Sequence, residues 1–228
     1  MSKKIAPENI KGKRGSYAGF VPSRKMGRMV SVMSRMAHQM AMLLETDPAI
    51  TSYESQSAPF TIEVDGVLKQ HEPTFVVERG NEILVIDVRP ASKRSEPRVA
   101  ARHSAIQGYC EQHGATFVAV DEEYLNQQPR MKNAEFLLRY AAMHFDEFSR
   151  KCVFEIFSDE VEMTIKEAMQ KLDTPHALTL ICSSVIAGDL RFNTSLELNL
   201  ETLVSPKFQE EEHEKPDRTP CRRYRRYA

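Results

Sequence analysis

A succession of short β-prone segments in the middle of the chain constrains the fold more than any other feature. Between residues 59 and 88 these segments alternate with the turn signals DG and RGN, as strands do in antiparallel hairpins. The last segment, EILVIDV, is apolar on both faces, which is typical of a central strand. A helix expected over residues 97–113 and a second buried strand, TFVAV, come next. This order predicts an α/β fold with a mixed sheet flanked by helices.

Apolar residues at helical spacing precede this region. The stretch SVMSRMAHQMAMLLET predicts a helix that ends at Asp47-Pro48, because proline cannot continue a helix. Residues 1–27 are polar and basic and are interrupted by glycine and proline, which predicts an N-terminal arm. We therefore expect a basic arm over residues 1–27 and a first domain over residues 28–150.

The C-terminal part of the chain has a different pattern. After a helix expected over residues 133–148 and the apolar run VFEIF, two helical segments, MTIKEAMQKL and HALTLICSSVIAG, flank a break at DTP, and DLRFNTSLELN follows. Helix, turn, helix and hairpin is typical of a winged-helix domain, which we expect over residues 151–205. Its second helix carries no Lys or Arg, so docking to a protein is favoured over contact with the DNA major groove. Residues 206–228 are expected to form a charged, disordered tail.

The charge of the chain is balanced in total but unevenly distributed. Its 31 Lys and Arg and 32 Asp and Glu give a formal net charge of −1, yet residues 1–39 hold nine basic residues and one acid. A second basic cluster surrounds Glu96. This segregation favours a polyanion partner, since phosphates attract Lys and Arg whatever the total charge. The side chains expected to bind DNA are Lys11, Lys13, Arg14, Arg24, Lys25, Arg28, Lys93, Arg94, Arg98 and Arg102.

Other classes of protein fit the sequence less well. No apolar run approaches the roughly 20 residues that a bilayer span needs, and no apolar stretch follows the charged N-terminus as it does in a secretory signal. We expect a cytoplasmic protein without a membrane partner. The four cysteines lack CxxC spacing, so neither a zinc site nor a disulfide framework is expected. Cys110, with His103 and His113, is a distant candidate for a hydrolase site, because no third group orients the pair.

Four segments together resemble a known nuclease domain. They are AMLLETDPAITSYESQS, PFTIEVDGVLKQHEPTFVV, EILVIDVRP and NQQPRMKNAEFLLRY. They resemble the N-terminal domain of TnsA, the endonuclease subunit of heteromeric Tn-seven-type transposases, over about residues 14–146. The resemblance implies a restriction-endonuclease-like (PD-(D/E)XK) fold followed by a small winged-helix-like domain. It also implies DNA as a partner, with a transposase subunit and an ATPase regulator as partners of the C-terminal domain.

The catalytic motif of that family is degenerate in this chain. The family uses a helical acid, a strand Asp, and a Glu or Gln followed two residues later by Lys, and its carboxylates hold the Mg²⁺ that activates water. These positions fall at Ala37, Thr74, Asp87 and Arg89, of which only Asp87 is acidic. A lone carboxylate beside an arginine is expected to form an ion pair rather than to hold Mg²⁺. We therefore expect a DNA-binding pseudo-nuclease without a cofactor.

Two alternatives stay open. An active endonuclease that cuts at element ends would need a rearranged site, in which Glu72, expected on the strand face of Thr74, joins Asp87 in holding Mg²⁺. Glu54 or Glu63 would be other substitutes for the missing acids. A scaffold or regulator without nucleic acid would instead bind proteins through the acidic winged-helix-like unit and the N-terminal arm.

Overall fold

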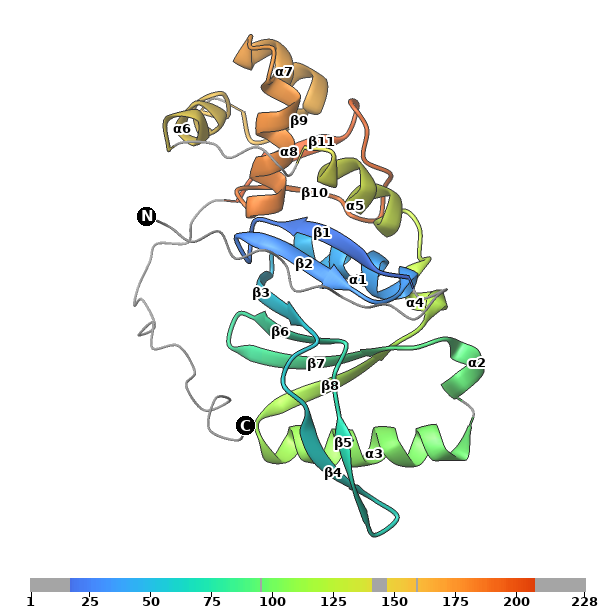
Figure 1. The fold of residues 1–228 in the computed structure, drawn as a ribbon. Helices are drawn as coiled ribbons and strands as arrows, with labels where there is room; N and C mark the ends of the chain where they lie inside the picture. Colours follow the sequence, from blue (N-terminus) through green and yellow to red (C-terminus); the bar gives the residue numbers. More distant parts are fainter. Residues whose placement is uncertain (1–16, 95, 141–146, 159, 208–228) are drawn as a thin grey trace.

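A four-stranded mixed sheet lies at the centre of the molecule in the computed structural model, which describes residues 17–94, 96–140, 147–158 and 160–207 (Figure 1). In the strand order β3-β6-β7-β8, the pairs β3/β6 and β6/β7 are antiparallel and the pair β7/β8 is parallel. The bounds are Ile50–Ser55 for β3, Phe75–Arg79 for β6, Glu82–Val88 for β7 and Ala115–Val120 for β8. The expected α/β class with a mixed sheet is confirmed.

Both faces of β7 are covered by helices. Leu84 and Ile86 pack with α1 (Arg35–Thr46) on one face. Val85 packs with α3 (Pro97–Gln112) on the other face. Successive side chains of a strand point to opposite faces, so a strand buried on both faces needs the continuous apolar run that β7 has.

Two β-hairpins extend this core. The first, β1 (Gly19–Ser23) with β2 (Arg28–Val32), lies beside α1. The second, β4 (Phe60–Val64) with β5 (Val67–His71), lies beside α3 and projects away from the sheet (Figure 1).

The first hairpin corrects the expected arm over residues 1–27. Val21, Val30 and Val32 are buried in the core with α1, while their strand neighbours are exposed or half-buried. This alternation buries one face of a hairpin, although glycine and proline obscure the pattern in the sequence. Residues 19–27 therefore belong to the folded core, and residues 1–16 lie outside the described part of the chain.

One helix, α5 (Arg130–Leu138), joins two hydrophobic cores. Met131 and Ala134 pack into the core around α1, whereas Leu137 packs into the C-terminal core. The expected helix over residues 133–148 is wrong at both ends. Two single-turn helices complete the first part of the chain, α2 (Ala91–Arg94) and α4 (Glu122–Leu125).

The C-terminal core is built from helices and a three-stranded antiparallel sheet with the order β10-β11-β9. The expected domain boundary at residues 150/151 falls inside α6. The VFEIF run begins within this helix and buries Val153 and Phe157, which are four residues apart, in the C-terminal core. No described helix is long and apolar enough to cross a bilayer. The bounds are Glu147–Glu155 for α6, Met163–Thr164 for β9, Ile165–Leu172 for α7, Ala177–Ala187 for α8, Leu190–Phe192 for β10 and Leu203–Pro206 for β11.

Candidate functional site around Asp87

Asp87 lies near the end of β7 with its carboxylate turned toward the α3 side of the sheet. It has the same strand parity as Val85, which packs with α3, and only 2% of its surface is exposed. A carboxylate buried to this extent needs partners, because an unpaired buried charge is costly. The partners of Asp87 therefore define the site.

Both carboxylate oxygens of Asp87 face a nitrogen. Arg89 Nε donates to Oδ2 at 3.3 Å, and His71 Nε2 lies 3.5 Å from Oδ1. Arg89 remains 36% exposed, so its guanidinium reaches from the buried carboxylate to the surface. Asp87 is thus the inner member of an ion pair, as the sequence predicts.

His71, the last residue of β5, is completely buried beside Asp87. Burial lowers the pKa of His71 to about 4, against the opposing pull of the Asp87 charge, so the imidazole is neutral at pH 7. Arg102 Nη2 lies 2.9 Å from His71 Nδ1. Because a guanidinium can only donate, Nδ1 must accept, and the ring proton is on Nε2. This Nε2 lies 3.5 Å from Asp87 Oδ1 but forms no hydrogen bond with any described residue.

Arg102 approaches this cluster from α3. Its Nη2 also donates to the Gln70 carbonyl at 3.4 Å, while its Nε is buried and has no hydrogen-bond partner in the described part of the chain. Arg98, one turn earlier on α3, is exposed. The cluster therefore combines one carboxylate with the guanidinium groups of Arg89 and Arg102, which leaves an excess of positive charge.

Thr74 and Glu72 do not add metal ligands to Asp87. Thr74 Oγ1 accepts a hydrogen bond from the Val88 amide at 3.0 Å. Glu72 is exposed in the connection between β5 and β6, where the buried Pro73 has no amide to pair with a neighbouring strand. The expectation that Glu72 shares a strand face with Thr74 is therefore wrong, since residue 72 is outside β6.

Ala37 lies on the opposite side of the sheet from Asp87. It is buried in the α1 core together with Ile86, whereas Asp87 follows Val85 toward α3. The structure thus brings together three of the four motif positions, Thr74, Asp87 and Arg89. The helical position, Ala37, lies elsewhere.

The residues at this place do not fit Mg²⁺. Mg²⁺ prefers anionic oxygen ligands in near-octahedral geometry. Here the one carboxylate, that of Asp87, is paired with Arg89 and lies beside His71. Within the described ranges, no three or more His, Cys, Asp or Glu residues are grouped so that they could hold a metal ion.

The basic residues expected to bind DNA fall into separate places. Those of the β1–β2 turn lie on the α1 side of the sheet and those of α3 on the other side (Figure 1). Arg28 pairs with Glu54 at 3.5 Å. The structure does not describe Lys11, Lys13, Arg14 or the side chains of Lys93 and Arg94.

Lys25 is engaged in the fold rather than free at the surface. Its Nζ donates to the carbonyl oxygens of Leu44, at 2.7 Å, and of Asp47, at the end of α1. Burial lowers the pKa of Lys25 to about 8, opposed by the nearby Glu45 and Asp47. Such a lysine caps a helix C-terminus, where carbonyl groups lack intrahelical partners.

Sequence analysis missed two buried polar residues, His71 and Glu45. Glu45 is fully buried and accepts hydrogen bonds from the Ser23 hydroxyl, the Arg24 amide and the Tyr53 hydroxyl, at 2.6, 2.8 and 2.9 Å. The only sequence signal for Glu45 is an acid on the apolar face of α1. His71 has no such signal, because its burial depends on where the second hairpin packs.

The second helix of the C-terminal unit, α8, is buried over most of its length and carries no charge.

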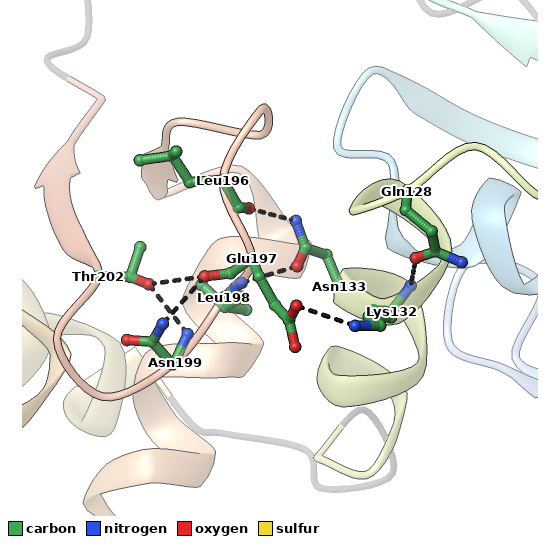
Figure 2. A network of polar contacts seen from close by, with 8 residues as sticks. All are labelled: Gln128, Lys132, Asn133, Leu196, Glu197, Leu198, Asn199 and Thr202. Atoms are coloured by element: carbon green, nitrogen blue, oxygen red, sulfur yellow. Dashed lines mark hydrogen bonds and ion pairs between the residues drawn. The ribbon is translucent and has the colours of Figure 1, made fainter.

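The loop between β10 and β11 is fixed to α5 instead of standing free (Figure 2). Asn133 donates to the Leu196 carbonyl at 2.9 Å and accepts from the Leu198 amide at 2.7 Å. This clamp connects the C-terminal unit with the helix that joins the two cores.

No protein-family model matches the chain, and no curated protein matches it either.

Proposed function

We propose that the chain is a TnsA-like DNA-binding protein of a transposition or mobile-element system that does not cleave DNA itself. The observation that carries this proposal is the environment of Asp87. The acid that the resemblance assigns to metal binding is paired with Arg89 and faces His71, and Thr74 is bonded to the backbone.

The order of the elements supports the restriction-endonuclease-like part of the proposal. Helix α1, the antiparallel strands β3, β6 and β7, helix α3 and the parallel strand β8 follow one another along the chain. This is the order of helix, antiparallel strands, helix and strand that the sequence pattern predicts. In the C-terminal unit, a helix, a short strand, two helices and a hairpin agree with a winged-helix-like domain.

The charges beside Asp87 support DNA binding at this end of the sheet. Arg89 is partly exposed, Arg98 is exposed on α3, and Arg102, one turn later on α3, is half-buried. Guanidinium groups bind phosphate oxygens in bidentate geometry. A phosphate of the DNA backbone placed here would meet positive charge where the related nucleases use a cation.

The features of α8 favour a protein partner for the C-terminal unit. An uncharged helix that is largely buried has no side chains for base edges. Phe148 and Val161, in contrast, expose large apolar side chains near α6, with 73% and 68% of their surfaces accessible. Exposed apolar groups of this kind fit contact with a protein, for which we propose a transposase subunit or its ATPase regulator.

The proposal is tested by measuring cleavage and binding on the same protein. Supercoiled plasmid incubated with the protein and Mg²⁺ or Mn²⁺ is expected to stay intact. A fluorescent duplex is expected to bind with an affinity that falls with salt, and Arg98→Gln should reduce the slope of log K against log salt by about one. Lys166→Gln, an exposed lysine of α7, is the matched control and should leave the slope unchanged.

Two results would contradict the proposal. Nicking that disappears in Asp87→Ala would establish the alternative of an active endonuclease. Binding that does not respond to salt would remove DNA as the partner and leave the protein scaffold.

A further inference from the structure

A cavity of about 660 Å³ lies between the central sheet and the C-terminal unit. It is bordered by α1, the inner strand β7, α5, α8 and β10. Its volume is within the range of about 300–1,000 Å³ that is typical of small-molecule sites. The cavity is separate from the Asp87 cluster, because the β7 residues that line it, Leu84 and Ile86, face α1 and not α3.

The walls of the cavity are aliphatic. Met40 and Leu43 of α1, Leu84 of β7, Leu137 of α5 and Val185 of α8 line it. All five are buried. Such walls take up a hydrocarbon body and offer it no hydrogen bond, so the polar selectivity of the site depends on the remaining lining residues.

The charged lining residues are almost all basic. Arg79, Arg130, Arg191 and Lys207 line the cavity, and Asp47 is the one carboxylate among its described lining residues. Arg79 is paired with Glu82 at 2.6 Å. The other three cations form no ion pair within the part of the chain that the structure describes, so the site has a net positive charge.

Arg130 is the cation best placed to hold an anion. Its guanidinium lies 4.1 Å from the centre of the Tyr124 ring, and its Nη2 donates to the Tyr124 carbonyl at 2.9 Å. Its Nε is buried and lacks a hydrogen-bond partner in the described residues. The guanidinium is part of the cavity lining, so a carboxylate bound in the cavity would meet its positive charge.

We propose that this cavity binds a small amphipathic carboxylate, with its hydrocarbon body against the aliphatic walls and its carboxylate at Arg130. This inference does not rest on the proposed function. The carboxylate would meet a guanidinium that stacking on Tyr124 holds in a fixed orientation. The hydrocarbon would bury apolar surface of α1, α5 and α8 at once, and so would tie the two cores together.

The test compares three ten-carbon probes that differ only in the head group: decanoate, decanol and decylammonium. Calorimetric titration of the full chain is expected to show one molecule of decanoate bound per chain. Decylammonium should bind at least tenfold more weakly, because three unpaired cations repel it. Decanoate should also raise the melting temperature in proportion to its saturation of the site.

Two variants locate the binding. Arg130→Gln should weaken decanoate about tenfold or more and leave decanol unchanged, since it removes a charge-assisted hydrogen bond. Ala187→Leu, at the exposed end of α8 where it lines the cavity, should weaken both probes by narrowing the space. Lys151→Gln, an exposed lysine outside the lining, is the control.

The proposal is overturned if decanoate does not bind the full chain. It is also overturned if decylammonium binds as well as decanoate, or if Arg130→Gln binds decanoate with unchanged affinity while its melting temperature shows it to be folded.

Discussion

Asp87 is a buried carboxylate whose two oxygens both face nitrogen atoms of neighbouring side chains. Arg89 pairs with one oxygen, and Nε2 of His71 lies 3.5 Å from the other. The orientation of His71 depends in turn on Arg102, which donates to Nδ1. Four side chains from β5, β7, the segment after β7 and α3 thus fix one another, and each has a consequence that can be measured.

The protonation of His71 makes the stability of the fold depend on pH. The folded state holds the pKa of His71 at about 4, below the ordinary value of 6.5. Between these values the unfolded chain binds more protons than the folded one, so the free energy of unfolding falls as pH falls from about 6.5 to 4. In urea unfolding, His71→Gln should reduce the loss of stability between pH 7 and pH 5 by on the order of 1 kcal/mol.

His113→Gln is the control for this measurement, because His113 is exposed at the end of α3. This variant should show the wild-type dependence on pH. An identical loss of stability in wild type and His71→Gln would show that His71 titrates normally in the folded protein.

Thr74 is expected to act on stability through the backbone. Its hydroxyl accepts from the Val88 amide at 3.0 Å, so Thr74→Val leaves that amide without its partner. The variant should lose about 1–2 kcal/mol of unfolding free energy. Thr74→Ser keeps the hydroxyl and should retain most of the stability, whereas equal losses in both variants would point to packing as the cause.

At the scale of elements, the first hairpin and α1 form one unit through a buried acid. Glu45 on α1 accepts from Ser23 and Arg24 at the hairpin turn and from Tyr53 on β3. Burial, the largest cause, raises the pKa of Tyr53 well above its usual range, so the phenol remains a donor to this carboxylate. The hydrogen bonds from Ser23 and Tyr53 to Glu45 join residues that are 22 and 8 positions apart.

Removal of this carboxylate should loosen the hairpin. Glu45→Ala leaves three donors without their acceptor and is expected to cost about 3 kcal/mol or more of unfolding free energy. Hydrogen exchange of the β1 and β2 amides should accelerate more than that of β6 and β7. Glu63→Ala, an exposed acid on β4, should change neither quantity by more than about 0.5 kcal/mol.

At the scale of the whole molecule, the two hydrophobic cores are connected by α5 and by the loop between β10 and β11. The loop is held at Asn133, which is 5% exposed and bonded to the backbone at Leu196 and Leu198 (Figure 2). A neighbouring ion pair, Lys132 with Glu197 at 3.0 Å, is exposed. The Asn133 side chain and the Lys132–Glu197 ion pair both connect α5 to this loop, so the effects of substitutions at the two positions on stability can be compared directly.

Asn133→Ala should weaken the connection between the cores. The loss of two hydrogen bonds to buried or partly buried backbone is expected to cost about 2–3 kcal/mol, and proteolysis should begin in residues 193–202. Lys132→Ala removes only the exposed ion pair and should cost less than about 1 kcal/mol. Similar losses in the two variants would mean that the clamp at Asn133 contributes little to stability.

The sequence and the structure agree best for the central sheet. The alternating segments and the doubly apolar EILVIDV run predicted the hairpins and the buried strand, because strand periodicity is local information. The arm over residues 1–27 was wrong from residue 19 onward, since Gly19 and Pro22 hid a one-sided alternation. The ends of the helix predicted over residues 133–148 were wrong, because α5 packs on two cores and this packing, rather than periodicity, decides where it begins and stops.

The sequence by itself determined the α/β class, the central strand and the ion pair between Asp87 and Arg89, which are only two residues apart in the chain. Only the tertiary structure decided that His71 and Arg102 join this pair, that Lys25 caps α1, and that Glu45 holds a hairpin. Those contacts connect residues 16 to 31 positions apart. Such pairings depend on how helices, strands and hairpins are packed in three dimensions, and local patterns in the chain carry no record of that packing.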